Sequence, residues 1–530
     1  MRPGICRATL IATACFGAFG WSQQASAETV LRRGNGAEIE SLDPAKQETI
    51  AGLHVVLDAY QGLTDVAPDG NIQTGVAERW EVSSDGKTYT FYLRDNARWS
   101  NGDPLTADDY VYSWIRALDP ATKSPFAFFL DKVRGANAFR TGKVKDASAV
   151  GVKALDVRTL QVELENPTPY FLVMLRTPVT FAVHRATVEK YGDQWTRPEN
   201  FVGNGAYRLT EWLPNVQMTF VKNGQYWDAG NVKVDKVVFY PIEDSSKELE
   251  KFSAGELDMT YTVPDDKHDE LLKDFQDEYR QGPYFGTYYF QFNTKAAPFD
   301  NPQVRRALAL AIDREHFVRD VAGGGEVPAY GLVPPGVPGY VNQSADFRHL
   351  THEQRLAEAM RIMRTLGYSG SNPLRLEIMF NTSSRHKKFS ETVKAMWQQI
   401  HVDATLLELD YKTVLERRRS GQFEVNRASW IGDYVDPATF LENLMIGTQQ
   451  NDSRYESQHY TALVRASYSL ADDKQRMAQL QKAEALMLAD LPVAPVFHYV
   501  SKRLVSKNVI GWQNNALGFV LTRWLSKAPE

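Results

Sequence analysis

The sequence predicts a mixed α/β fold, and two kinds of hydrophobic pattern support this class. Residues 88–93 and 237–240 are short runs of β-branched and aromatic side chains, which are typical of strands. Residues 303–318 and 391–400 instead carry apolar side chains at the spacing of a helix face. We therefore expect strands and helices to be interspersed along the whole chain.

The N-terminal segment, residues 1–27, has the organisation of a secretory signal peptide. Two arginines precede an apolar stretch over residues 8–19, and Ala25 and Ala27 provide the small side chains of a cleavage site. The apolar stretch is shorter than the roughly 18 residues that a membrane-spanning helix needs. We expect cleavage after Ala27, export of the mature chain and no stable membrane insertion.

The predicted mature protein is large, acidic and free of cysteine. Both cysteines, Cys6 and Cys15, lie within residues 1–27, so neither a disulfide nor a thiolate site is expected. Lipid attachment at Cys15 is an alternative, although residues 12–14 lack the usual leucine. A domain of roughly 150 residues implies about three domains in the predicted mature chain of 503 residues, which is 530 less the first 27. Loss of the two arginines lowers the net charge from −5 to −7, which argues against a nucleic-acid partner.

Turn signals separate the predicted elements. Residues 67–70, 84–86 and 101–104 contain Asp-Gly or Asn-Gly pairs, which favour tight turns. Residues 333–339 (VPPGVPG) are the one Pro/Gly-rich stretch long enough to form a separate loop. No charge block, repeat or low-complexity tract interrupts the pattern, so we expect the whole mature chain to fold.

Motifs of catalysis and metal binding are absent from the sequence. We find no G-x-S-x-G, H-E-x-x-H or P-loop, and no G-x-G-x-x-G that opens a helix. Ser384 and Lys387 satisfy S-x-x-K, but so short a pattern arises by chance in a chain of this length. The histidines show no metal-ligand spacing. We therefore expect no enzymatic activity, no metal and no cofactor.

One segment, residues 427–437, combines a cation, an aromatic ring and carboxylates. A strand here would direct the side chains of Arg427 and Trp430 to opposite faces, shortly before Asp433. Composition alone leaves two interpretations open. The segment is either an ordinary sheet edge that ends in an Asp-capped turn before a helix near Pro437, or part of a ligand site.

A family resemblance extends along nearly the whole mature chain. Residues 75–80 (GVAERW) and 88–109 (TYTFYLRDNARWSNGDPLTADD) resemble the signature of the extracellular solute-binding proteins that carry peptides. Further matches follow in order at residues 41–44, 204–207, 226–228, 255–259, 304–308 and 313–314. Within this family the sequence is most similar to the oligopeptide-binding branch, through residues 381–388 and 430–433.

The resemblance implies an α/β, two-lobed periplasmic binding protein fold with an extra domain and a hinged ligand cleft between the lobes. Chain crossings near residues 284–287 and 500–502 would form the hinge. The expected domains are a discontinuous lobe I domain (residues 28–60, 185–284 and 501–530), an extra family-specific domain (61–184) and a lobe II domain (285–500).

The resemblance also implies which residues hold the two charged ends of a peptide. Asp433 matches the family's carboxylate for the α-ammonium group, and Glu48 matches a nearby acidic residue. Arg427, Arg418 and His386 match positions that meet the C-terminal carboxylate at different peptide lengths. A buried ammonium requires a buried carboxylate, because an unpaired charge is costly to desolvate.

Backbone and side-chain contacts complete the implied site. Residues 48–50 and 429–431, including Ile50, Ser429 and Ile431, match segments that pair with the peptide backbone as in strand addition. The expected aromatic walls of the side-chain pockets are Phe126, Tyr261, Tyr288, Trp430 and Tyr499.

At three positions in or near the implied site the sequence differs from close relatives. Three of the candidate binding residues also have an alternative interpretation as residues without a ligand role. Phe126 replaces a tyrosine, and Gly286 and Ile431 replace cysteines found in some relatives, so we carry over no side-chain preference. His386 has the alternative of a surface histidine, and Tyr261 and Tyr288 that of core residues.

The resemblance implies a monomeric protein that captures oligopeptides and delivers them to an inner-membrane ABC permease with its ATPase subunits. Within the same fold, the alternatives are a dipeptide, a murein peptide, an opine, a sugar or a metal complex. Outside binding proteins, the alternative is a periplasmic hydrolase.

Overall fold

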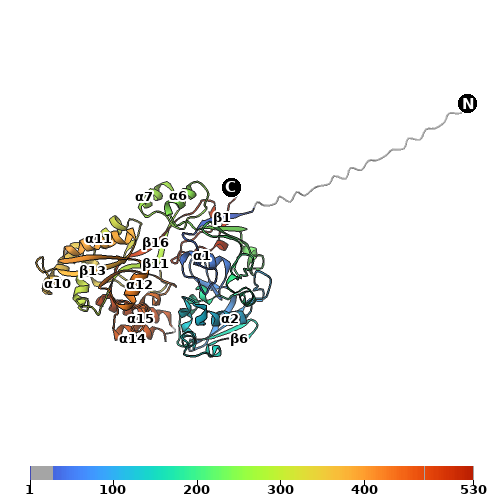
Figure 1. The fold of residues 1–530 in the computed structure, drawn as a ribbon, viewed down its shortest axis with the longest axis horizontal. Coiled ribbons are helices and arrows are strands. Elements are labelled where there is room, and N and C mark those ends of the chain that lie inside the picture. The colour runs from blue at the N-terminus through green and yellow to red at the C-terminus, as the bar shows by residue number, and fades with distance from the viewer. Residues whose placement is uncertain (2–27, 471, 529–530) are drawn as a thin grey trace.

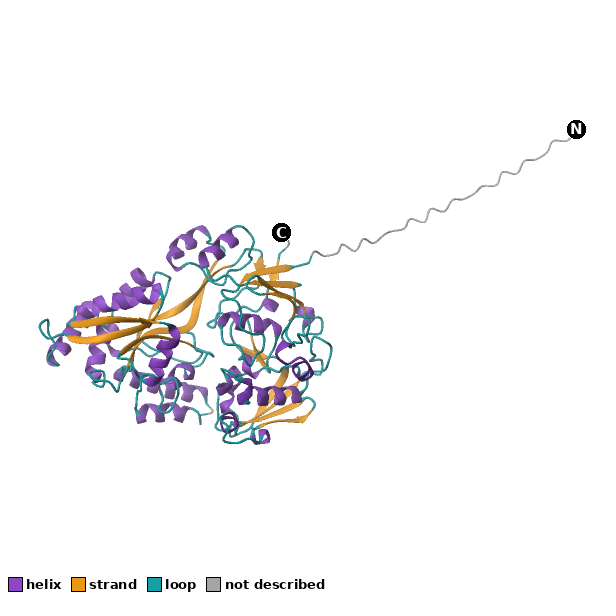
Figure 2. Cartoon of the chain, in the orientation of Figure 1, coloured by secondary structure: helices purple, strands orange, loops and turns teal. Residues whose placement is uncertain are grey.

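The computed structural model describes residue 1, residues 28–470 and residues 472–528, and it has two lobes (Figure 1). The predicted signal peptide lies almost entirely outside the described residues. Within the described ranges, every helix is too short or too polar to span a bilayer. The mixed α/β class expected from the sequence is confirmed, since helices and strands alternate through both lobes (Figure 2).

The lobe on the left of Figure 1 is built on one six-stranded sheet with the order β12-β16-β11-β15-β13-β14. Its strands are β11 (Tyr279–Phe292), β12 (Val327–Pro328), β13 (Leu374–Asn381), β14 (Val402–Leu409), β15 (Val425–Ile431) and β16 (Val493–Leu504). Its helices are α8 (Pro302–Ala311), α9 (Arg314–His316), α10 (His352–Thr365), α11 (Ser384–Gln398), α12 (Tyr411–Ser420), α13 (Ala438–Leu441), α14 (Gln458–Ser467) and α15 (Asp473–Asp490). Phe290 and Trp397 are fully buried where α11 packs on the sheet.

The other lobe contains two four-stranded sheets, with the orders β1-β10-β9-β8 and β4-β5-β7-β6. Their strands are β1 (Val30–Gly34), β4 (Ala77–Val82), β5 (Thr88–Leu93), β6 (Val152–Asp156), β7 (Thr159–Glu163), β8 (Tyr207–Leu213), β9 (Gln217–Lys222) and β10 (Lys236–Tyr240). Two further two-stranded sheets are β2 (Thr64–Val66) with β3 (Ile72–Thr74) and β17 (Val509–Ile510) with β18 (Ser526–Lys527). The helices are α1 (Ile50–Ala59), α2 (Ala107–Leu118), α3 (Ala136–Arg140), α4 (Phe171–Met174), α5 (Arg185–Tyr191), α6 (Ser245–Ser253) and α7 (His268–Asp274).

Several elements follow directly from the local sequence. The predicted strand over residues 88–93 is β5, in which Tyr89, Phe91 and Leu93 are buried while the intervening side chains are more exposed. The predicted strand over residues 237–240 lies in β10, and the helix expected near Pro437 is α13. These predictions are confirmed.

The predicted continuous helix over residues 303–318 is wrong, because the chain leaves the helical conformation at Ile312. Helix α8 ends at Ala311, and Ile312 has an extended backbone. Asp313 then caps a new short helix, with its side chain accepting a hydrogen bond from the backbone N–H of His316. Apolar periodicity continues through this interruption because the residues on both sides of it face the same core. The apolar periodicity therefore gave no sign that one helix ends at Ala311 and that Asp313 caps another.

Two long antiparallel strands, β11 and β16, connect the six-stranded sheet to the other lobe. At their far end Tyr279 is opposite Leu504, whose backbone carbonyl accepts a hydrogen bond from Thr260. The register of this pair shifts between Pro283 and Thr287, so the ladder is irregular where a chain crossing was expected. The hinge and the domain boundaries stay predictions.

Candidate functional site

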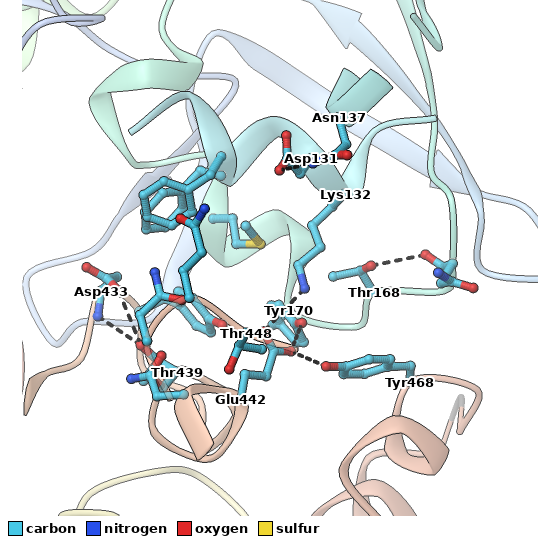
Figure 3. A pocket seen from close by; sticks show the side chains of 18 of the residues that line it. Asp131, Lys132, Asn137, Thr168, Tyr170, Asp433, Thr439, Glu442, Thr448 and Tyr468 are labelled. Atoms are coloured by element: carbon cyan, nitrogen blue, oxygen red, sulfur yellow. Dashed lines mark hydrogen bonds and ion pairs between the residues drawn. The ribbon is translucent and has the colours of Figure 1, made fainter. Parts of the chain in front are cut away.

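Three adjacent cavities lie along the boundary between the lobes. The cavity in Figure 3 has a volume of about 550 Å³ and is lined from one lobe by Lys132 and Tyr170 and from the other by Asp433 and Glu442. A second cavity of about 890 Å³ shares Trp430 with the first. A third, of about 130 Å³, shares Asp433 with the first. Residues of β15 or of the turn after it line all three cavities.

The C-terminal half of β15 has an unpaired edge. On one side, Ser429, Trp430 and Ile431 pair antiparallel with β11. On the other side, β13 pairs with β15 only at Val425 and Asn426, and no other strand of the described chain covers residues 429–431. In an antiparallel ladder, alternate residues direct their N–H and C=O groups away from the partner strand. Backbone donors and acceptors are therefore available here, next to the cavities that these three residues line.

Asp433 lies two residues beyond this edge, where its carboxylate is removed from bulk water. The Thr439 hydroxyl accepts a hydrogen bond from the backbone N–H of Asp433 at 3.2 Å and donates to its carboxylate at 3.5 Å (Figure 3). Burial raises the pKa of the Asp433 carboxyl to about 6, against the opposing effect of the nearby Arg176 cation. A buried carboxylate with so few partners is an energetic cost that a bound cation would relieve.

The other acidic candidate, Glu48, lines the 130 Å³ cavity from the opposite lobe and is exposed. Ile50 also lines that cavity but is the first residue of α1, which Thr49 caps. The backbone N–H groups of Glu48 and Thr49 both donate to the carboxylate of Glu40. Residues 48–50 therefore offer fewer free backbone groups than residues 429–431.

Two of the candidate carboxylate-binding residues, Arg427 and His386, both lie near the Tyr288 ring. The Arg427 guanidinium is 4.9 Å from the ring centroid, and the His386 ring centroid is 6.3 Å from it. Burial, with smaller contributions from Arg427 and Arg385, lowers the pKa of His386 to about 3. His386 is thus half-buried and neutral at pH 7 in the ligand-free protein, rather than a surface histidine.

The third candidate cation, Arg418, lies apart from that pair. It lines the 890 Å³ cavity and forms an ion pair with Asp452 at 2.6 Å. Its Nε atom is buried and has no hydrogen-bond partner within the described residues. Arg418 therefore keeps a donor for a further anion, although Asp452 already neutralises its charge.

The aromatic candidates separate into two groups. Phe126 lines the cavities of 130 and 890 Å³, and Trp430 lines those of 550 and 890 Å³. Tyr261, Tyr288 and Tyr499 line none of the three cavities. Tyr288 is fully buried and stacks on Phe497 in the core, and Tyr499 packs edge-on against the same phenylalanine, whereas Tyr261 packs against His54.

Residues that sequence reasoning missed also lie at this boundary. Arg176 follows α4, is 4% exposed, and donates from Nη2 to the backbone carbonyl of Asp433 at 2.9 Å. Glu442 accepts hydrogen bonds from Tyr170 and Tyr468 and pairs with Lys132 at 3.2 Å. Arg176 had a visible signal, since it is the one charged residue in an otherwise uncharged stretch over residues 170–183. Glu442 had none.

Comparisons with known proteins agree with this architecture. The model of the bacterial extracellular solute-binding proteins, family 5 (middle region), matches residues 71–452. The chain is 38% identical to the periplasmic oligopeptide-binding protein OppA of Salmonella typhimurium, covering 92% of this chain and 90% of that protein. It is 37% identical to the periplasmic murein peptide-binding protein MppA of Escherichia coli, over 90% and 89% of the two chains.

The fold itself is also similar to a solved structure. The crystal structure of Haemophilus influenzae OppA in complex with the peptide RPPGFSPFR is 34% identical in sequence and superposes with a TM-score of 0.81, over 95% of this chain and all of that one. The similarity in sequence and the similarity in structure thus each cover more than nine-tenths of the chain. The chain belongs to the bacterial extracellular solute-binding proteins of family 5.

Proposed function

We propose that this chain is the periplasmic substrate-binding component of an ABC importer, and that its ligands are oligopeptides held between the two lobes. The observation that carries the proposal is an unpaired strand edge at residues 429–431 that borders a cavity and is followed by the buried carboxylate of Asp433. An edge of free backbone groups binds any extended peptide, and a carboxylate at its end fixes where the peptide begins.

In this arrangement the peptide backbone adds to β15, and its α-ammonium group pairs with Asp433, with Glu48 adding negative charge across the cavity. Arg427, Arg418 or His386 receives the C-terminal carboxylate, according to peptide length. Trp430 and Phe126 line the side-chain pockets. Such contacts read the ends of a peptide and its main chain, so they tolerate varied sequences.

The remaining expectations belong to the same proposal. The protein acts as a monomer, hands its ligand to an inner-membrane permease with ATPase subunits, and does not cleave the peptide. Signal peptide cleavage after Ala27 places it in the periplasm. The residues that would hold the ligand comprise carboxylates, guanidinium groups and backbone groups, which bind peptides without any activated nucleophile.

Native mass spectrometry of the protein purified from periplasm tests the proposal. We expect bound ligands whose masses and fragment ions are those of short peptides. After unfolding and refolding to remove them, the protein should bind trialanine and pentaalanine in calorimetry and leave both uncut after prolonged incubation. A single non-peptide adduct, together with no binding of either peptide, would contradict the proposal. Cell-wall peptides among the adducts would instead identify a murein peptide carrier.

A further inference from the structure

The 130 Å³ cavity contains a buried cation that the proposed contacts with peptide termini do not use. Arg176 lines this cavity together with Asp433 and Glu48. Its Nη2 atom donates to the backbone carbonyl of Asp433, not to the carboxylate. Its Nε and Nη1 atoms are buried and have no hydrogen-bond partner among the described residues. Of the three guanidinium nitrogen atoms, only Nη2 therefore has a hydrogen-bond acceptor among the described residues.

A buried guanidinium in this state is energetically unfavourable. Burial lowers the pKa of Arg176 to about 9, with the Asp433 charge acting in the opposite direction, so the side chain stays protonated at pH 7. The centroid of the Phe519 ring is 5.5 Å from the guanidinium carbon. An aromatic face compensates a desolvated cation far less than a carboxylate does. A bound anion that accepts hydrogen bonds from Nε and Nη1 would therefore stabilise the Arg176 guanidinium.

Arg176 and Asp433 come from different lobes. Arg176 lies in the turn between α4 and the 3₁₀ helix Pro178–Thr180, whereas Asp433 follows β15 of the six-stranded sheet. Opening of the cleft would separate the two and make the unpaired nitrogens accessible, and closure would bring both charges onto one ligand. The cavity thus presents a cation beside the carboxylate that takes the ammonium group.

We propose that Arg176 is a specificity-determining residue that binds a carboxylate on the side chain of the first peptide residue. This inference rests on the proposed function, because it needs the α-ammonium group at Asp433. With that group fixed, the atoms closest to Arg176 belong to the first side chain. The preferred ligands are peptides that begin with glutamate or aspartate.

A peptide panel measured by calorimetry on the refolded protein tests this inference. We expect Glu-Ala-Ala to bind about tenfold to a hundredfold more tightly than Gln-Ala-Ala, the range for a charge-assisted hydrogen bond. Ala-Glu-Ala and Ala-Gln-Ala should differ far less, because the second side chain points elsewhere along an extended peptide.

Two variants distinguish a specific effect of Arg176 on ligand preference from a general effect of positive charge in the cleft. Arg176→Met should abolish the preference for Glu-Ala-Ala over Gln-Ala-Ala. Arg140→Met is the matched control, since Arg140 lines the neighbouring 550 Å³ cavity but is already paired with Asp131 at 2.5 Å. It should leave the preference intact.

The outcomes distinguish the two proposals. If neither Ala-Ala-Ala nor pentaalanine binds the unaltered protein, the proposed function fails and this inference fails with it. If Ala-Ala-Ala binds but Glu-Ala-Ala and Gln-Ala-Ala bind equally, only this inference is overturned. A preference that survives in Arg176→Met would also overturn it. The comparison on the unaltered protein needs no variant, so poor folding of Arg176→Met would not leave the question open.

Discussion

Replacement of Asp433 by asparagine should weaken binding of a free peptide severely while leaving the fold intact. Removal of one partner of a buried charge pair typically costs about 2–5 kcal/mol, which corresponds to roughly thirtyfold to several thousandfold in affinity. The unaltered protein with the N-acetylated peptide should show a similar loss. Combining both changes should cost less than their sum, because one interaction can be lost only once.

The pH dependence of binding gives the same prediction an independent signature. The pKa of Asp433 is about 6 in the ligand-free protein, and a bound ammonium group would lower it by stabilising the ionised form. Affinity should therefore fall as pH drops through 6, by about tenfold between pH 7 and pH 5. In the ligand-free protein His386 does not titrate in this interval, because its pKa is about 3. The Asp433→Asn variant should show a flat profile, and affinity for the acetylated peptide should not fall as the pH drops, because no ammonium group stabilises the ionised carboxylate.

The stability of the variant is the control. Because the pKa of the Asp433 carboxyl is raised above its ordinary value in the folded state, its contribution to stability is present at low pH and lost as pH rises through about 6. At pH 7 the ionised carboxylate therefore opposes folding, and Asp433→Asn should unfold at the same or a higher temperature without ligand. Calorimetry in which the acetylated and free peptides bind equally, or a pH-independent affinity for the free peptide, would refute the reasoning.

Three further predictions concern length, closure and compaction. Arg427→Met should weaken some peptide lengths more than others, because in the proposed function Arg418 receives the carboxylate of peptides of another length. An equal loss from dipeptide to pentapeptide in calorimetry would contradict this. Glu442→Gln removes the ion pair with Lys132 and weakens the hydrogen bond from Tyr170, both of which join the lobes. The radius of gyration of the ligand-free protein in solution scattering should therefore rise, and affinity for peptide should fall several-fold. No change in either quantity would contradict this prediction. Peptide added to the stripped, unaltered protein should reduce the radius of gyration, since a hinged cleft closes on its ligand, and an unchanged scattering profile at saturation would count against a hinged cleft.

Local sequence patterns predicted the elements whose environment is simple. The alternation of β5 is visible because one of its faces is buried and the other is not. The helix over residues 303–318 was predicted wrongly because the same core covers both sides of the break at Ile312, so that burial alone did not reveal it. Residues 48–50 illustrate a similar limit, since Thr49 caps a helix that begins at Ile50.

The site could be predicted only where a family resemblance supplied the positions. Asp433, Trp430 and Phe126 do lie along the cavities, whereas Tyr288 is a core residue beneath Arg427. The contact of Arg176 with Asp433 joins residues 257 positions apart in the sequence. No local pattern can predict such a contact, and the resemblance assigned no role to this arginine. Only the folded chain brings the two charges together.

A crystal structure of the refolded protein with a tripeptide bound is the most direct test of the central claim. We predict an extended peptide between the lobes, with its backbone hydrogen-bonded to residues 429–431 and its α-ammonium group within hydrogen-bonding distance of the Asp433 carboxylate. A peptide that binds elsewhere, or one that runs in the opposite direction with its C-terminal carboxylate near Asp433, would contradict the account.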